Sequence, residues 1–286
     1  MDPALLLNTI LLRPYVFIFL LIYLIGCSLH LGLKRAVIFC AAGYFITWMS
    51  EYSSIHTGFP YGFYYYIEHT RGEEIWVFGV PFMDSLSYVF LAYASYCVAL
   101  TVTSPIQITK YGFYLLETRH SRSSFSTRVL GAVFLVYLDI IIDPVALRGN
   151  KWFLGQIYGY PDGGHYFGVP ISNFAGWFAV GYVLIFALQK IDTLLANRNS
   201  RDLAGYRYPL RYLIGPSLYL VILIFNLSIT FFIQEYTLGW TGIFILLLPT
   251  LLLCVLMKLK QREGNPGSAL TAHLRDFPGA VTPESP

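Results

Sequence analysis

The chain has 286 residues, of which 56% are hydrophobic and 12% are charged, and its net charge is +3 at pH 7. Soluble domains carry about 25% charged residues, so this composition excludes an ordinary soluble domain and favours a protein embedded in lipid. The mean hydropathy of +0.57 agrees with that. The four cysteines lie in apolar stretches without CxxC spacing, which argues against a disulfide framework, and no basic and aromatic groove suggests a nucleic-acid partner.

Seven apolar stretches predict seven membrane-spanning helices, since a helix needs about 20 mostly apolar residues to cross a bilayer. In chain order they cover residues 14–33, 36–52, 82–104, 128–147, 172–190, 212–234 and 238–257. The predicted fold class is therefore an all-α polytopic membrane protein. We expect one helical membrane domain over residues 1–258, with its first span retained rather than cleaved as a signal. A disordered cytoplasmic tail is expected over residues 259–286, which are rich in Pro, Gly, Ser and charge.

Basic residues predict the orientation, because cytoplasmic loops carry an excess of Lys and Arg. The loops after the first, third and fifth helices and the tail hold 15 of the 19 basic residues. These are Lys34, Arg35, Lys110, Arg119, Arg122, Arg128, Lys190, Arg198, Arg201, Arg207, Arg211, Lys258, Lys260, Arg262 and Arg275. We therefore expect a multi-pass protein of the cell membrane, with its N-terminus outside and its C-terminus in the cytoplasm.

A short repeat precedes two of the predicted helices. Phe78-Gly-Val-Pro81 leads into the third helix and Phe167-Gly-Val-Pro170 leads into the fifth. A duplication of the second and third helices as the fourth and fifth would produce this pattern, and a chance match of four residues is the alternative.

Several carboxyl groups fall inside the predicted spans, where ionisable groups are costly and usually functional. Asp139 and Asp143 are four residues apart and lie on one face of the fourth helix, towards its outer end. Glu51 closes the second helix and Asp84 opens the third at the same end. We expect a polar pocket in the outer leaflet that contains Glu51, His56, Asp84, Asp139, Asp143 and Asn173.

Each of these groups also has a structural explanation. Asp84 is suited to capping its helix, and Glu51 with His56 is suited to a solvated pair at the interface. The tyrosines of residues 61–66 fit an aromatic belt. Asp139 is the hardest to explain in this way, because a carboxylate at that depth costs about 3 kcal/mol.

Motif spacing excludes several classes of membrane enzyme. The six histidines lack HxxH and HxxxH pairs, which argues against a di-iron hydroxylase or desaturase. The chain has no GxxxxGK[ST] or GxGxxG motif, and the last span has no lysine for a retinal Schiff base. We expect no metal and no redox cofactor.

The order of the remaining motifs resembles a known family. The matching pieces are Glu51 to Tyr66, Gly79-Val-Pro81, Leu138 to Pro144, Trp152 and Gly168 to Trp177. Over roughly residues 40–240 the chain is similar to the CruF-type carotenoid biosynthesis membrane proteins, which are carotene hydratases and include the bisanhydrobacterioruberin hydratases. The resemblance implies that water is added to a terminal isopropylidene double bond of an acyclic carotenoid, which gives a tertiary alcohol. It does not indicate which residues are catalytic.

The chemistry of hydration suggests roles for the polar residues. An alkene must be protonated on carbon, and water must then attack the tertiary cation while a base takes its proton. We expect Asp139 to be the acid and Asp143 or Glu51 to position and deprotonate water, with Asp84 and His56 as further catalytic candidates. Aromatic faces stabilise cations. The expected substrate-binding residues are Tyr61, Tyr64, Trp152, Asn173 and Trp177.

Two other functions fit the same residues. A proton-initiated cyclase or isomerase of polyprenoids would use the same acid without water. A transporter or proton relay would use Asp139 and Asp143, but it needs a polar route to the cytoplasm, and the inner halves of the predicted helices lack acids. For the hydratase, the expected partners are the lipid bilayer and a carotenoid that reaches the site from lipid.

Overall fold

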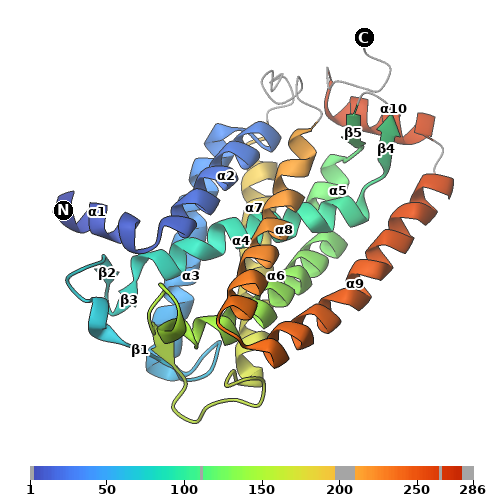
Figure 1. Cartoon of the computed structure of the whole chain (residues 1–286). Helices are drawn as coiled ribbons and strands as arrows, with labels where there is room; N and C mark the ends of the chain where they lie inside the picture. The colour runs from blue at the N-terminus through green and yellow to red at the C-terminus, as the bar shows by residue number, and fades with distance from the viewer. Residues whose placement is uncertain (1–2, 110–111, 197–209, 264–265, 279–286) are drawn as a thin grey trace.

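Long helices make up most of the described part of the chain, residues 3–109, 112–196, 210–263 and 266–278, in the computed structural model of the protein (Figure 1). Those at the predicted spans are α2 (Pro14–His30), α3 (Leu33–Thr57), α4 (Phe82–Thr103), α6 (Phe125–Ala146), α7 (Ile171–Leu194), α8 (Arg211–Phe232) and α9 (Tyr236–Glu263). Shorter helices are α1 (Pro3–Leu12), η1 (Glu68–Thr70), α5 (Arg119–Ser123), η2 (Gly149–Lys151) and α10 (Pro266–Asp276). The predicted class, an all-α polytopic membrane protein, is confirmed.

The number of helices that can cross a membrane is five or six among the described residues. Helices α4, α6, α7, α8 and α9 are long and apolar enough by themselves, and α1 with α2 adds a sixth if the two are counted as one span across their 91° bend. Helix α3 lies at the second predicted span but is not among them. Its mean hydropathy is lowered by Lys34 and Arg35 at one end and by Glu51 near the other.

Helix α4 is the centre of the bundle. It packs against α2, α3, α6, α7 and α8, and its buried residues cover all sides of the helix from Met83 to Leu100. A helix that is apolar all round belongs in the interior. Small residues such as Ala92 and Ala99, both fully buried, allow its neighbours to approach closely.

The two Phe-Gly-Val-Pro segments adopt the same turn. The φ angles are 50° at Phe78 and 51° at Phe167, and they are also positive at the following glycines. Two successive positive φ angles are typical of a type I′ hairpin turn, which favours glycine. Strand β2 (Trp76–Val77) pairs with β3 (Val80–Pro81) across the first turn, and Tyr166 bridges to Val169 across the second.

The repeat extends into the helices that follow the turns. Pro81 is the N-cap residue of α4 and Pro170 is that of α7. Three residues further on come Asp84 and Asn173, and seven residues further on come Tyr88 and Trp177. The repeat predicted from sequence is thus a structural repeat of turn and helix start, while its origin by duplication stays a prediction.

A ribbon of two short strands joins the long loops of residues 58–81 and 147–170. Strand β1 (Tyr65–Tyr66) pairs antiparallel with β6 (Tyr158–Gly159), so that Tyr66 lies opposite Tyr158. Alternate residues of a strand share a face. Tyr64 and Tyr66 therefore point to one side, while Tyr65 points away and is 50% exposed. This end of the bundle, with β1 and both loops, is called the loop end below.

A buried ionic network lies at the opposite end, near the hairpin of β4 (Ile106–Thr109) and β5 (Gly112–Leu115). Glu117 is fully buried, with Nε2 of His30 3.0 Å and Nη2 of Arg122 2.5 Å from its carboxylate oxygens. Burial alone would raise the pKa of Glu117, but Arg122 and His30 outweigh it and hold this pKa well below its usual range. The network joins α2 to α5.

Helix α10 lies within the predicted disordered tail, residues 259–286, of which 264–265 and 279–286 lie outside the described residues. Residues 259–263 continue α9, and Pro266–Asp276 form a helix that packs on the ionic network. Nδ1 of His273 lies 2.6 Å from the carbonyl oxygen of Glu117, and the amide of Arg119 donates to Oδ2 of Asp276 at 2.9 Å. Phe277 lies 4.4 Å under the Arg122 guanidinium. Composition suggested disorder because these few contacts, rather than a long apolar run, hold the segment.

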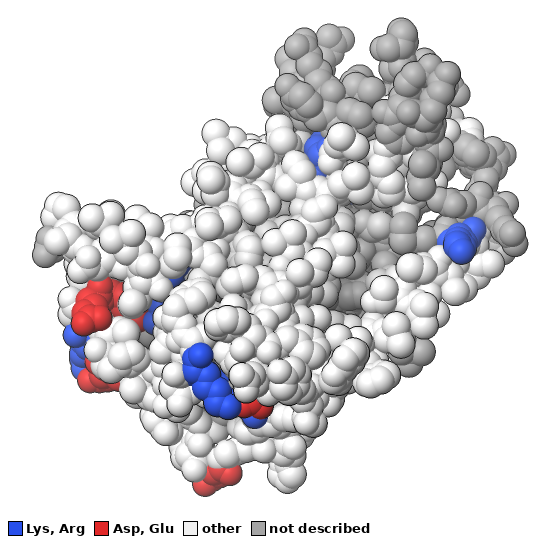
Figure 2. All heavy atoms as spheres, in the orientation of Figure 1, with Lys and Arg blue, Asp and Glu red and all other residues white. Residues whose placement is uncertain are grey.

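The predicted orientation in the membrane stays a prediction. Figure 2 shows that, on this face, charged side chains gather at the two ends of the bundle. Of the basic residues that predicted the cytoplasmic side, Lys34, Arg122 and Arg275 lie at the end opposite the loop end. Lys110, Arg198, Arg201 and Arg207 lie outside the described residues.

The orientation predicts which positions an impermeant thiol reagent can reach. The exposed native Cys254 is first replaced by alanine. Cysteine at Glu73 or at Asp162, both exposed at the loop end, is then expected to be labelled in intact cells. Cysteine at Arg275 is the control and should be labelled only after lysis. The opposite pattern would invert the orientation.

The ionic network predicts a stability effect at Glu117. Glu117→Gln leaves Arg122 buried without its charged partner, so the free energy of unfolding should fall by about 3 kcal/mol. Because the folded pKa of Glu117 is depressed, its contribution is complete at neutral pH and is lost as the pH falls below about 4. The free energy of unfolding of the detergent-solubilised protein, measured at neutral pH and below about pH 4, tests this. Glu68→Gln, in an exposed pair with Arg71, is the control and should change little.

Candidate functional site

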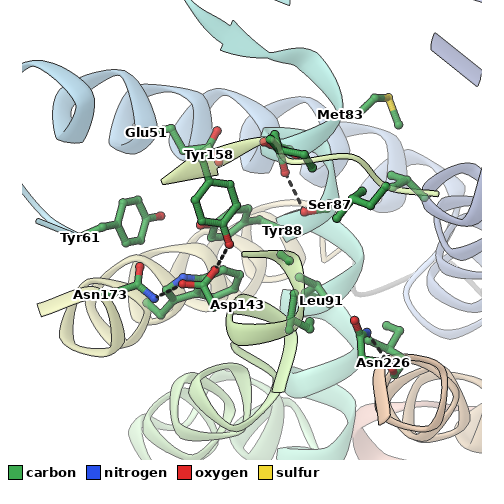
Figure 3. Close-up of a pocket in the computed structure, with 18 of the residues that line it drawn as sticks. Glu51, Tyr61, Met83, Ser87, Tyr88, Leu91, Asp143, Tyr158, Asn173 and Asn226 are labelled. Atoms are coloured by element: carbon green, nitrogen blue, oxygen red, sulfur yellow. Dashed lines mark hydrogen bonds between the residues drawn. The ribbon is translucent and has the colours of Figure 1, made fainter. Parts of the chain in front are cut away.

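A cavity of about 130 Å³ lies within the loop end of the bundle (Figure 3). A water molecule needs about 10–15 Å³ of such volume, so the cavity has room for several waters or for the end of a hydrocarbon chain. Its polar lining is Glu51, Asp84, Asp143, Asn173, Asn226, Ser87 and the tyrosines Tyr15, Tyr61, Tyr64, Tyr66, Tyr88, Tyr158 and Tyr160. The other lining residues are Val16, Phe19, Met83, Phe90, Leu91, Ile142, Ala146, Trp152, Leu154, Ile157, Trp177 and Ile222.

Asp143 is the most densely hydrogen-bonded carboxylate of the cavity. The hydroxyls of Tyr158 and Tyr160 both donate to it, the second at 2.8 Å. Nδ2 of Asn173 donates to it at 2.8 Å as well. In Figure 3, Asp143, Tyr158 and Asn173 point towards one another. Three donors stabilise the charged form of a carboxylate, so this arrangement favours an Asp143 anion.

The two phenols that serve Asp143 stay protonated. Burial raises the pKa of Tyr158 and of Tyr160 far above the usual value, and the charge of Asp143 raises both further. Both hydroxyls therefore remain donors at any physiological pH. They come from β6 and the residue that follows it, so the ribbon between the two long loops places them.

Asp139 lies behind the cavity rather than in its wall. It is fully buried, and its Oδ2 accepts from the same Nδ2 of Asn173 at 2.8 Å. Its Oδ1 has no hydrogen-bond partner among the described residues. Asp139 and Asp143 thus share one amide, as their spacing on one helical face predicted, but the cavity is lined by Asp143 without Asp139.

Glu51 occupies the part of the cavity wall formed by α3. It is 2% exposed, and the hydroxyl of Ser85 donates to its Oε2. Ser85 is held in turn, because its carbonyl oxygen accepts from Thr47 at 2.8 Å. The hydroxyl of Tyr66 lies within reach of both Glu51 and Asp84. Glu51 therefore receives fewer donors than Asp143 does.

Asp84 also lines the cavity and does not cap α4. The N-cap residue is Pro81, with no capping bond from a side chain, and Asp84 follows in the first turn. A carboxylate there is stabilised by the positive end of the helix dipole. A buried ion pair lies nearby, in which Arg13 donates to Glu74 at 3.0 and 2.6 Å.

His56 does not belong to the cavity, which corrects the prediction for this residue. It is exposed, its Nδ1 lies 2.7 Å from the carbonyl oxygen of Tyr52, and its ring packs on the Tyr52 ring. The reason is that α3 continues to Thr57. Five residues along a helix correspond to a rotation of about 140°, so Glu51 and His56 point in different directions.

Aromatic rings complete the cavity wall. Trp177 stacks on Tyr88 with 4.2 Å between ring centroids and 17° between planes, and Tyr61 lies within 6.5 Å of both. All of the residues predicted to bind substrate line the cavity, namely Tyr61, Tyr64, Trp152, Asn173 and Trp177. The aromatic-belt interpretation fits Tyr65, which is half exposed, and not Tyr61 or Tyr64, which are buried.

Sequence reasoning missed several residues of the site, above all Tyr66, Tyr88, Tyr158 and Tyr160. Two signals would have found them. Tyr158 and Tyr160 alternate with Gly159, and Tyr64 and Tyr66 stand on either side of Tyr65, as expected for residues that share one face of a strand. Tyr88 also stands as far after its Phe-Gly-Val-Pro segment as Trp177 does after the other.

Comparison with known families shows to which family the chain belongs. Residues 6–256 match the model of a family described as carotenoid biosynthesis protein. The chain belongs to this family. No curated protein and no solved structure matches the chain. The carotenoid biosynthesis family indicates a biosynthetic enzyme whose long apolar helices suit a lipid-embedded carotenoid substrate, which confirms the resemblance and the broad role expected from the sequence.

A glycine of α7 predicts how the site is held together. A Cβ at Gly176 would lie 2.7 Å from the carbonyl oxygen of Pro60 and 2.8 Å from Cα of Tyr61. Gly176→Ala should therefore push the 58–66 segment away and lower the free energy of unfolding by about 1–3 kcal/mol. At Gly131 a Cβ would meet only the flexible tip of Ile185 at under 3 Å, so Gly131→Ala is the matched control. Equal stability of the two variants, measured by thermal unfolding, would contradict the prediction.

Proposed function

We propose that the protein is a carotenoid hydratase, which adds water to a terminal isopropylidene double bond of an acyclic carotenoid. One observation carries the proposal. A single small cavity contains a carboxylate with three hydrogen-bond donors, Asp143, and a buried carboxyl group with fewer donors, Glu51. Different surroundings push two such groups towards different protonation states, which is what acid–base catalysis requires.

Glu51 is the proposed proton donor. A buried carboxyl group with few donors favours its neutral form, because the anion is poorly solvated. Its proton passes to the less substituted carbon of the double bond, the π electrons form the new C–H bond, and the adjacent carbon becomes a tertiary cation. This role was expected of Asp139, but that group does not line the cavity.

Asp143 is the proposed base. Its negative charge stabilises the cation, and it accepts a proton from the water that attacks the cationic carbon. The product gains one hydrogen on one carbon and one hydroxyl on the other. The proton returns from Asp143 to Glu51 through water in the cavity, so the enzyme is regenerated without any other reactant. Asp139 acts indirectly in this scheme, since it shares the amide of Asn173 with Asp143.

Aromatic faces assist the charged intermediate. The stacked rings of Trp177 and Tyr88 and the ring of Tyr61 form part of the cavity wall. A cation over such a face is stabilised by roughly 2 kcal/mol where water is excluded. The hydroxyls of Tyr158, Tyr160 and Tyr66 give attacking water polar neighbours, which favours hydration over cyclisation.

The product formed in a host that makes an acyclic carotenoid tests the reaction. We expect a pigment heavier by one water, or by two if both ends react, that carries a tertiary alcohol. Mass spectrometry of extracted pigments measures it, and a host without the protein is the control. A product of unchanged mass with a ring or a shifted double bond would instead identify a cyclase or isomerase.

The two carboxyl groups predict different defects in heavy water. Glu51→Gln removes the acid, so hydration should fall by about 10²–10⁴-fold and recovered substrate should contain no solvent deuterium. Asp143→Asn leaves the acid but impairs water capture, so the cation loses a proton again and deuterium should enter recovered substrate. Glu68→Gln, exposed and outside the cavity, is the control. Near-normal hydration by Glu51→Gln would exclude this acid and point to Asp84.

A further inference from the structure

The cavity extends sideways from its carboxyl groups towards α2 and α8. Val16 and Phe19 of α2 and Ile222 and Asn226 of α8 belong to its lining. In Figure 3, Asn226 lies on the side of Leu91, away from Tyr61 and Asn173. The two helices pack against each other beside this side of the cavity. This side of the cavity is mainly apolar, apart from Tyr15 and Asn226, while Glu51 and Asp143 lie on the other side.

The volume of the cavity limits what it can hold. Pockets that enclose a whole drug-sized ligand measure about 300–1,000 Å³. A cavity of about 130 Å³ accommodates only the reacting end of a carotenoid. The long remainder of the chain must pass between elements of the bundle to reach lipid. It will avoid the walls where tyrosine hydroxyls and carboxyl groups would lose their hydrogen bonds.

An aromatic cluster stands where α2 and α8 meet the cavity. We call it the portal cluster, and it consists of Tyr15, Phe19, Trp152, Phe153 and Phe225. The ring of Tyr15 is stacked on Phe225 at 5.4 Å and lies 5.8 Å from Phe153. Tyr15, Phe19 and Trp152 line the cavity, whereas Phe153 is 55% exposed. The cluster thus runs from the cavity to the outer surface.

The surface beside the portal cluster is suited to lipid. On α2, Ile18 and Leu21 are 56% and 58% exposed, and on α8, Leu220 and Ile224 are 56% and 62% exposed. An apolar chain that leaves the cavity here exchanges aromatic neighbours for lipid, and the nearest charged groups, Arg13 and Asp84, lie on the side of Tyr15. The face of a flat polyene also packs well on aromatic rings, which gives this path contact area.

From these contacts we propose that the portal cluster, between α2 and α8, is the binding site for the polyene chain of the substrate. The terminal isopropylidene group then lies near Glu51 and Asp143, and the conjugated chain passes Tyr15, Trp152 and Phe153 into the bilayer. The inference rests on the proposed function only in taking an acyclic carotenoid as the ligand. It concerns binding and does not depend on the reaction.

Photo-crosslinking in lipid nanodiscs tests the portal. p-Benzoylphenylalanine replaces Phe153, and an acyclic carotenoid is added. With isotopically labelled carotenoid, we expect the yield of adduct to saturate with carotenoid concentration and to fall when unlabelled carotenoid competes. Mass spectrometry of the adduct measures the yield. The same label at Phe244, 67% exposed on α9, is the control for chance contact with carotenoid in lipid. Non-saturable cross-linking at Phe153, or equal cross-linking at both positions, would overturn the proposal.

Blocking the portal gives a second, independent result. Val16→Trp fills the α2 side of the cavity, so carotenoid affinity at the Phe153 label should weaken about tenfold or more. Ile18→Trp, on the lipid face of the same helix, is the matched control and should retain the carotenoid affinity of the unblocked protein. If Val16→Trp does not fold, Ala146→Phe narrows the same cavity from α6. Unchanged affinity in a folded blocking variant overturns the proposal. Saturable cross-linking at Phe153 without formation of a hydrated pigment would refute the proposed hydratase activity but not the proposed binding site.

Discussion

Carboxyl groups buried in an apolar helix bundle are the constraint on which the rest of this structure depends. Neither lipid nor apolar side chains solvate them, so the polar groups that do must be built into the bundle. One amide, that of Asn173, serves both Asp139 and Asp143. Two further donors reach Asp143 from the β1–β6 ribbon, through Tyr158 and Tyr160. The long loops at this end are therefore part of the site and not mere connections between helices.

The repeated turn and helix start carries different polar residues in its two copies. The same positive-φ turn and the same proline begin α4 and α7, and the equivalent third residues are Asp84 in one and Asn173 in the other. A carboxylate and an amide are nearly equal in size, but the carboxylate only accepts hydrogen bonds, whereas the amide also donates them. The repeated backbone thus places a carboxyl group, Asp84, in one part of the cavity wall and a hydrogen-bond donor to Asp143, Asn173, in another.

The two ends of the bundle have different physical roles. At the loop end, carboxyl groups face a cavity with room for water and a substrate end. At the opposite end, Glu117 is fully matched by Arg122 and His30, and α10 packs on top of them. A buried ionic network in which a carboxylate has two charged or polar partners is rigid. It joins α5 to α2, whose other end lines the cavity.

The sequence by itself determined the helices and much of the site. Runs of apolar residues with isolated carboxyl groups specify both, because burial of apolar surface and the cost of buried charge act residue by residue. Glu51, Asp84, Asp143, Asn173 and Trp177 were all placed at one end in this way. Only the tertiary structure decided which of the predicted residues face the cavity and which tyrosines join them. The extension of α3 to Thr57 turned His56 outwards, and the pairing of β1 with β6 brought Tyr66 and Tyr158 together from loops about 90 residues apart. Such outcomes depend on helix rotation and strand register, which arise from contacts between distant segments and leave no periodic signal in the sequence.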